Sequence, residues 1–168
     1  MRQRSSSRQF GFTLVEILVA IAIIGVLATV VTAASGGALK KARDAKRKAE
    51  LSQFGRFLSA GCFMPDAGPG EHDFADVMAE LKAKNPQYAQ LLTKTPRDPK
   101  KGTDDDSFYR YAVSENGQKC AVFANLENAV EPVTLTGVSA PAPGGGTGVL
   151  QAAEAGWNGT DRFFQVSN

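Results

Sequence analysis

The sequence predicts an α+β fold in which one long N-terminal helix packs on a small antiparallel β-sheet. Three observations support this prediction: an apolar run near the N-terminus, an amphipathic continuation to residue 60, and short alternating segments separated by turn residues. The 168 residues suit one globular domain in addition to the apolar run. We therefore expect three parts, a short basic segment at 1–11, a long helix at 12–60, and a globular domain at 61–168.

The first part of the expected helix, residues 12–34, is long and apolar enough to cross a membrane. It contains no Lys, Arg or Asp, and 23 helical residues span roughly 34 Å, against a bilayer core of about 30 Å. Its one acid, Glu16, costs at most about 3 kcal/mol, which thirteen large apolar residues outweigh. An acid inside a membrane segment predicts a functional site with a partner group.

The residues Gly11-Phe12-Thr13-Leu14-Val15-Glu16 follow a short basic leader and open the apolar run. This arrangement closely resembles the N-terminal signature of type IV prepilins and type II secretion pseudopilins. The resemblance implies that a prepilin peptidase cuts between Gly11 and Phe12 and that Phe12 is then N-methylated. It also implies that Glu16 pairs with the Phe12 amine of a neighbouring subunit. Such a pair would set the axial register, because a subunit in the wrong register would leave both charges unpaired at low dielectric.

The resemblance also implies a pilin-like fold and a function. We expect a structural subunit of a type IV pilus-like surface filament, not an enzyme, and no cofactor. Its implied partners are copies of itself, the prepilin peptidase, and a pilus or secretion assembly platform. The precursor would cross the inner (cytoplasmic) membrane once, and the mature subunit would join a cell-surface or periplasmic filament. The alternative within the family is a pseudopilin or minor pilin of a type II secretion or DNA-uptake system.

Charge patterning leaves alternatives open. A simple signal anchor, or a secretory signal peptide cut near Ala33-Ala34-Ser35, would also carry a basic start and an apolar run. The basic cluster at 40–48 would by itself place the C-terminal part in the cytoplasm, whereas the leader and the two cysteines favour export. We expect this cluster to be a solvated helix face with Asp44 pairing to Arg47 and Lys48, with anionic lipid as the alternative.

The charge balance argues against nucleic acid as a partner. Removing residues 1–11 takes away three of the 19 basic residues, so the remaining chain carries 16 basic and 17 acidic residues.

The helix is expected to end at the turn residues 62–70, and a second helix is expected at Asp73–Lys84. Apolar side chains recur at helical spacing in both segments. The predicted core stripes are Leu51, Phe54, Phe57 and Leu58 in the first helix and Phe74, Val77, Met78 and Leu81 in the second, followed by Tyr88, Leu91 and Leu92.

Four short segments are predicted as strands. Phe108–Val113 and Cys120–Asn125 flank Asn116-Gly117, which is a strong signal for a tight hairpin. Pro132–Val138 and Asp161–Val166 are expected to complete the sheet, with a flexible Pro/Gly-rich connection at Ala140–Gly148.

Cys62 and Cys120 are the only cysteines. An even count in an exported domain predicts a disulfide, which would close a loop of 59 residues and stabilise the fold by about 4 kcal/mol; two buried thiols are the alternative. Two cysteines and one histidine are too few for a closed zinc site.

Asp98, Asp104 and Asp106 are weak candidates for a calcium site, but their spacing does not match a regular calcium loop, so we expect a solvated acidic turn and no metal. The single histidine, His72, is expected to be an exposed loop residue.

Overall fold

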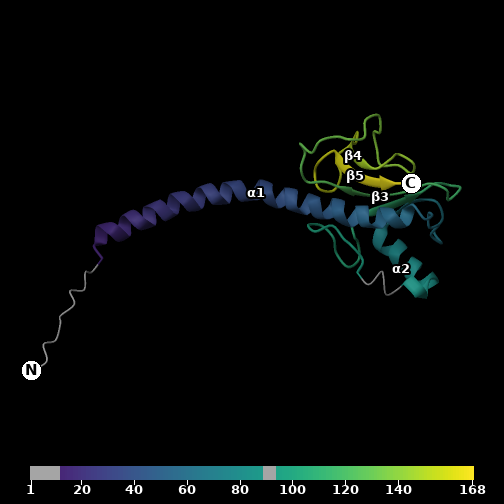
Figure 1. Ribbon diagram of the computed structural model, residues 1–168, viewed down its shortest axis with the longest axis horizontal. Helices are drawn as coiled ribbons and strands as arrows, with labels where there is room; N and C mark the ends of the chain where they lie inside the picture. Colours follow the sequence, from purple (N-terminus) through teal and green to yellow (C-terminus); the bar gives the residue numbers. More distant parts are fainter. Residues whose placement is uncertain (1–11, 89–93) are drawn as a thin grey trace, which may run out of the picture. The chain divides into compact units, whose positions relative to one another are not determined.

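The computed structural model describes residues 12–88 and 94–168. The leader with the predicted cleavage residue Gly11, and the predicted core residues Leu91 and Leu92, lie outside the described residues. The chain divides into two compact units, Met1–Ala38 and Leu39–Asn168. Helix α1, Leu14–Leu58, contributes its first part to the N-terminal unit and its second part to the globular unit (Figure 1).

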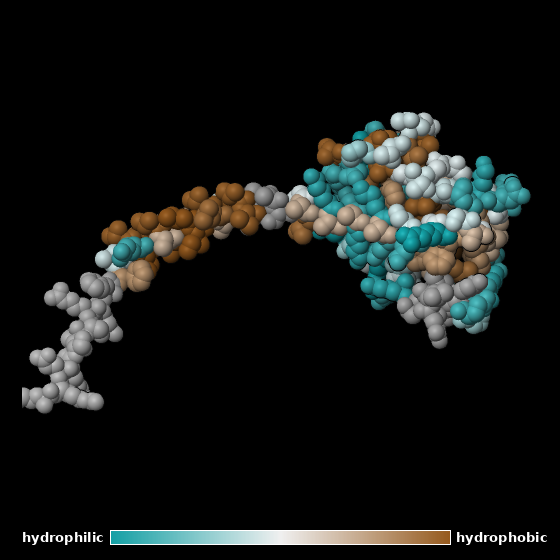
Figure 2. All heavy atoms as spheres, viewed as in Figure 1, coloured by the Kyte–Doolittle hydropathy of each residue, from teal (hydrophilic) through white to brown (hydrophobic). Residues whose placement is uncertain are grey.

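The described side chains of the N-terminal unit have no protein core of their own. All residues from 12 to 31 are exposed, and Figure 2 shows the surface that they form as almost continuously hydrophobic. Among the described residues, α1 is the one helix long and apolar enough to cross a membrane. A helix that is apolar all round is stable only when lipid or other helices cover it.

The globular unit combines the second part of α1, a shorter helix and a five-stranded antiparallel sheet. The strands follow the spatial order β1-β2-β3-β5-β4, with β3 in the centre. In Figure 1, α2 lies on the opposite side of α1 from β4 and β5. The elements are β1 (Gly70–Asp73), α2 (Phe74–Lys84), a 3₁₀ turn (Pro86–Tyr88), β2 (Arg110–Val113), β3 (Cys120–Asn125), β4 (Gly148–Gln151) and β5 (Arg162–Ser167).

The sheet is covered on both faces. The main core lies between the sheet and the two helices, where Leu51 of α1 and Met78 of α2 meet alternate residues of the strands. The opposite face is covered by loops and includes Phe123, Leu150 and Phe163. Because both faces are buried, β3 is buried along its whole length and its sequence shows no alternation of apolar and polar residues.

Local sequence signals explain most of these elements. Asp73 is the N-cap of α2, where its side chain accepts a hydrogen bond of 2.8 Å from the amide of Ala75. Gly55 allows α1 to approach β5 closely, since a Cβ at this position would overlap the side chain of Val166. The predicted disulfide between Cys62 and Cys120 is present, with 5.7 Å between the Cα atoms, and it ties the end of α1 to the start of β3.

Two expectations about the strands were wrong, and two further strands were not predicted. Pro132–Val138 is not a strand; the amides of Thr134 and Leu135 donate to the carbonyl of Val149, at 2.8 and 2.9 Å, and so cover the edge of β4. The sheet instead gains β1 and β4, each only four residues long, at its two edges. The strand predicted from Phe108 begins at Arg110, because Phe108 adopts a left-handed backbone conformation with φ of 56°.

One predicted core residue was also wrong. The side chain of Phe57 is 50% exposed, although Leu51 and Leu58 on the same helix are buried and Phe54 is half-buried. The core stripe of α2 is confirmed for Phe74, Val77 and Met78, with Leu81 packed against it.

Candidate assembly site and its supporting ion network

The first turn of α1 holds Glu16 in a fixed conformation. Its Oε2 atom accepts hydrogen bonds from both the amide and the hydroxyl of Thr13, each at 2.8 Å. In return, the amide of Glu16 donates to the Thr13 hydroxyl at 3.3 Å. This reciprocal pattern is a capping box, with Thr13 as the N-cap and Glu16 three residues later, and it satisfies amides that the helix itself leaves free.

The capping box leaves part of the carboxylate available. Both bonds from Thr13 end on Oε2, and among residues 12–88 and 94–168 no hydrogen-bond donor reaches Oε1. The side chain of Phe12, immediately before the cap, is 84% exposed. A neighbouring cation could therefore bind Oε1 without breaking the helix cap. The helix dipole also stabilises the negative charge of Glu16, because this acid lies at the N-terminus of α1.

A comparison with known families decides what this segment is. The family model for the prokaryotic N-terminal methylation motif matches residues 6–32. The chain carries the prokaryotic N-terminal methylation motif. This motif is the hallmark of type IV pilins and pseudopilins, a family of structural proteins. No curated protein and no solved structure matches the chain significantly.

The methylation motif and the fold agree with each other. The matched residues contain Thr13, Glu16 and the apolar part of α1, and the globular unit gives the chain the α+β pilin-like layout of a long helix with an antiparallel sheet. An apolar N-terminal helix with this motif fits a membrane-anchored precursor.

A buried ion network fixes the second part of α1 to the loops of the globular unit. Its centre is Arg47, whose side chain is 0% exposed. Arg47 donates two hydrogen bonds to Asp98, at 2.8 and 2.9 Å, and one to Asp44 at 2.6 Å. Its Nη2 also lies 2.9 Å from the Oε1 atom of Glu127. One guanidinium therefore joins α1, the loop before β2 and the loop after β3.

The carboxylates around Arg47 have further partners. Asp44 accepts from the amides of Glu127 and Asn128, both at 2.9 Å. Arg43 binds both oxygens of Glu127 at 2.7 Å, and the Lys100 ammonium lies 3.3 Å from the same carboxylate. Three acids thus face three cations, so the network is neutral.

Hydrogen bonding keeps Asp98 and Glu127 ionised. Burial alone would raise the pKa of Asp98, but the bonds from Arg47, Lys100, Lys101 and Asn158 outweigh it and lower the pKa to about 2. The pKa of Glu127 is lowered to about 2, chiefly by its bond to Arg43 and also by Arg47, against the opposing effect of burial.

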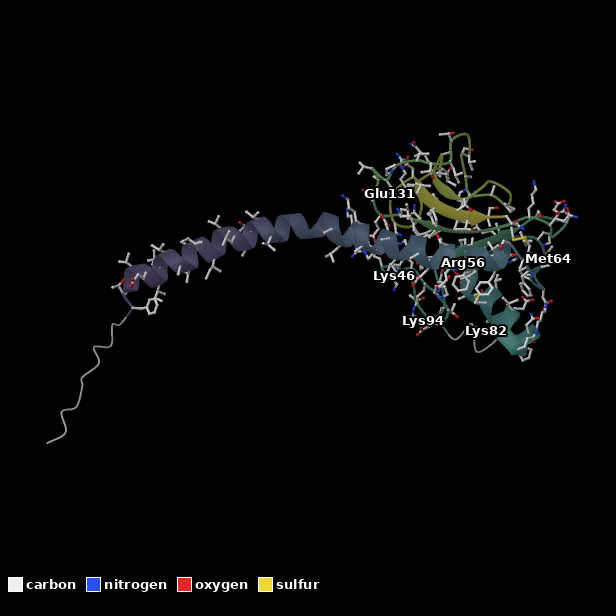
Figure 3. All side chains as sticks on the ribbon, in the orientation of Figure 1. Lys46, Arg56, Met64, Lys82, Lys94 and Glu131 are labelled. Atoms are coloured by element: carbon white, nitrogen blue, oxygen red, sulfur yellow. A yellow bond between two sulfur atoms is a disulfide. The ribbon has the colours of Figure 1, made fainter. Side chains whose placement is uncertain are left out.

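The network corrects the expectation of a solvated helix face at 40–48. Asp44 and Arg47 do pair, but both are buried, and Lys48 pairs with Glu131, labelled in Figure 3 on the loop after β3, not with Asp44. Lys46, also labelled in Figure 3, is half-exposed and lies 3.8 Å from Glu50.

The structure does not bring the candidate calcium ligands together. Asp98 binds Arg47, exposed Asp104 pairs with Arg97, and Asp106 pairs with Arg110. Within the described part of the chain, no three metal-ligating side chains form a cluster. The expectation of a solvated acidic turn was wrong for Asp98, which is 1% exposed.

The expectation of an exposed loop residue was wrong for His72. This residue is half-buried in β1, and its Nε2 atom lies 2.9 Å from the carbonyl oxygen of Gly68.

Proposed function

We propose that this chain is a structural subunit of a type IV pilus-like filament, not an enzyme. It is made as a membrane-anchored precursor, cut between Gly11 and Phe12 by a prepilin peptidase, and methylated on Phe12. It then polymerises through the apolar part of α1. The observation that carries the proposal is the methylation motif, on a helix whose large apolar side chains are all exposed up to Val31.

Glu16 sets the axial register of the proposed filament. The new amine of Phe12 on one subunit binds Oε1 of Glu16 on a neighbour, while Oε2 remains in the capping box. Away from water the two charges stabilise each other, and either one alone is unfavourable. The apolar helices supply non-specific packing, and this ion pair selects one axial offset.

Three variants separate the charge of Glu16 from its role as a cap. Glu16→Gln keeps an oxygen for the Thr13 bonds but removes the charge, Glu16→Ala removes both, and Val15→Leu is the matched control. Both Glu16 variants should insert in the membrane normally and lower the yield of sheared filaments at least about tenfold. Abundant filaments from Glu16→Gln would refute the register role.

The same experiment addresses the alternative, a pseudopilin or minor pilin of a secretion or DNA-uptake system. Such a subunit would be processed at the same site but would give no abundant surface filaments even as the wild type. Its partners would then be the secretion or uptake platform and other subunits, and Glu16 variants would be scored by crosslinking between subunits.

A further inference from the structure

The face of the sheet opposite α1 carries a pocket that the proposed function does not use. Its volume is about 430 Å³, within the range of about 300–1,000 Å³ typical of ligand sites. Buried Phe123 and Phe163 line it together with half-buried Trp157, whereas the lining acids Glu71 and Glu154 are exposed. The other lining residues are small or apolar: Ser139, Ala140, Pro141, Ala152, Ala153, Ala155 and Gly156. The pocket therefore has an aromatic floor and an acidic rim.

The aromatic floor is held rigidly. The rings of Trp157 and Phe163 meet edge to face at 5.6 Å between centroids, and those of Phe123 and Phe163 at 6.4 Å. Such packed aromatic pairs stabilise each other, and the faces of their rings attract cations.

The surrounding charge also favours a cation. Arg110 contacts three carboxylates, with Glu71 at 3.7 Å, Asp106 at 3.0 Å and Asp73 as a closer partner. The three carboxylates and the Arg110 guanidinium together carry a net charge of −2. Glu154 brings the net charge around the pocket to −3. The charged side chains among the residues that line the pocket, Glu71 and Glu154, are both acidic, so the lining favours a cationic ligand over an anionic one.

Arg110 itself shows that the indole accepts a cation. Its guanidinium carbon lies 5.8 Å from the centroid of the Trp157 ring, close enough for a cation–π contact. This ring therefore already makes one cation–π contact, which is the type of contact that would hold a second basic side chain.

We propose that this pocket binds the side chain of a lysine or arginine presented by a partner protein. The aliphatic stem would lie against Ala152, Ala153 and Pro141, and the cation would reach Glu71 and Glu154. A volume of about 430 Å³ exceeds one side chain, so flanking backbone of an extended segment fits as well. This site belongs to the globular unit and does not depend on whether the chain polymerises.

Trp157 makes the proposal directly testable, because it is the only tryptophan in the chain. The full-length protein in detergent micelles is titrated with acetyl-Ala-Lys-Ala-amide while the Trp157 fluorescence is recorded. We expect a saturable change with this peptide and with its arginine analogue. The norleucine analogue, which has the stem without the charge, should bind at least about threefold more weakly. About 0.5 M NaCl should also weaken binding.

Matched variants locate the binding. Glu154→Gln should lower the association constant about threefold, and Ala153→Phe, which fills the pocket, should abolish the change. Glu115→Gln, an exposed acid in the turn between β2 and β3, should change nothing. The proposal fails if the norleucine peptide binds equally well, if no saturable change occurs up to about 10 mM peptide, or if Glu154→Gln and Glu115→Gln behave alike. It also fails if maltose, a neutral sugar, changes the Trp157 fluorescence and the peptides do not.

Discussion

Replacing Arg47 by alanine should destabilise the globular unit severely. The substitution removes two bonds to Asp98 and one each to Asp44 and Glu127, all in a site where the guanidinium is fully buried. Arg43 and Lys100 still neutralise Glu127, but Asp98 loses its only basic ion-pair partner among the described residues. Leaving one member of a buried pair unmatched costs about 3–5 kcal/mol.

This loss is large relative to the stability of a domain. Typical domains unfold with about 5–15 kcal/mol. For a unit of 130 residues, Leu39–Asn168, each 1 kcal/mol lowers the melting temperature by about 4 °C, so a shift of about 12–20 °C is expected. Arg47→Lys should fall between wild type and Arg47→Ala, because an ammonium keeps the charge but cannot bind Asp98 through two parallel bonds.

The assay is thermal unfolding of the protein in detergent, followed by the fluorescence of Trp157 in the globular unit. Lys46→Ala is the control, since Lys46 precedes Arg47 on the same helix but is half-exposed, and its 3.8 Å pair with Glu50 contributes at most about 1 kcal/mol. If Arg47→Ala melts within about 2 °C of Lys46→Ala, the ion network does not hold the loops to α1.

Three further predictions concern pH, the disulfide and the cap. The lowered pKa values of Asp98 and Glu127 stabilise the fold fully above about pH 5, and this contribution is lost as the pH falls from about 4.5 to 2; Asp98→Asn should flatten that slope in acid-unfolding curves. Replacing Cys62 and Cys120 together by serine should cost about 4 kcal/mol, measured by urea unfolding, and reductant should then have no further effect. Thr13→Ala should speed amide exchange in the first turn of α1, with a loss of about 0.5–2 kcal/mol, whereas Thr29→Ala should leave that turn unchanged.

Local sequence signals predicted much of the fold. The apolar part of α1, the capped helix α2 and the hairpin of β2 and β3 each carry their own pattern of periodicity, cap or turn residues. The disulfide was predictable because Cys62 and Cys120 are the only pair available. The edge strands were not predictable, because β1 and β4 have four residues each and their pairing depends on neighbours distant in sequence.

The ion network was missed because a charged helix segment usually faces solvent. The partners of Arg47 are distant in sequence, since Asp98 lies 51 residues away. One signal could have found it: Asp44 and Arg47 precede the buried Leu51 by seven and four residues, and Leu51 precedes Leu58 by seven. All four therefore lie on one helix face, and this spacing extends the core stripe into the charged cluster.

The most direct test of the proposed function is the intact mass and N-terminal sequence of the protein extracted from its native membrane. We expect a chain that starts at Phe12 and carries one added methyl group, and we expect that replacing Gly11 by a bulkier residue leaves the precursor uncut. A wild-type chain that still starts at Met1 would contradict the proposed function, because the leader would then not be a substrate for the prepilin peptidase.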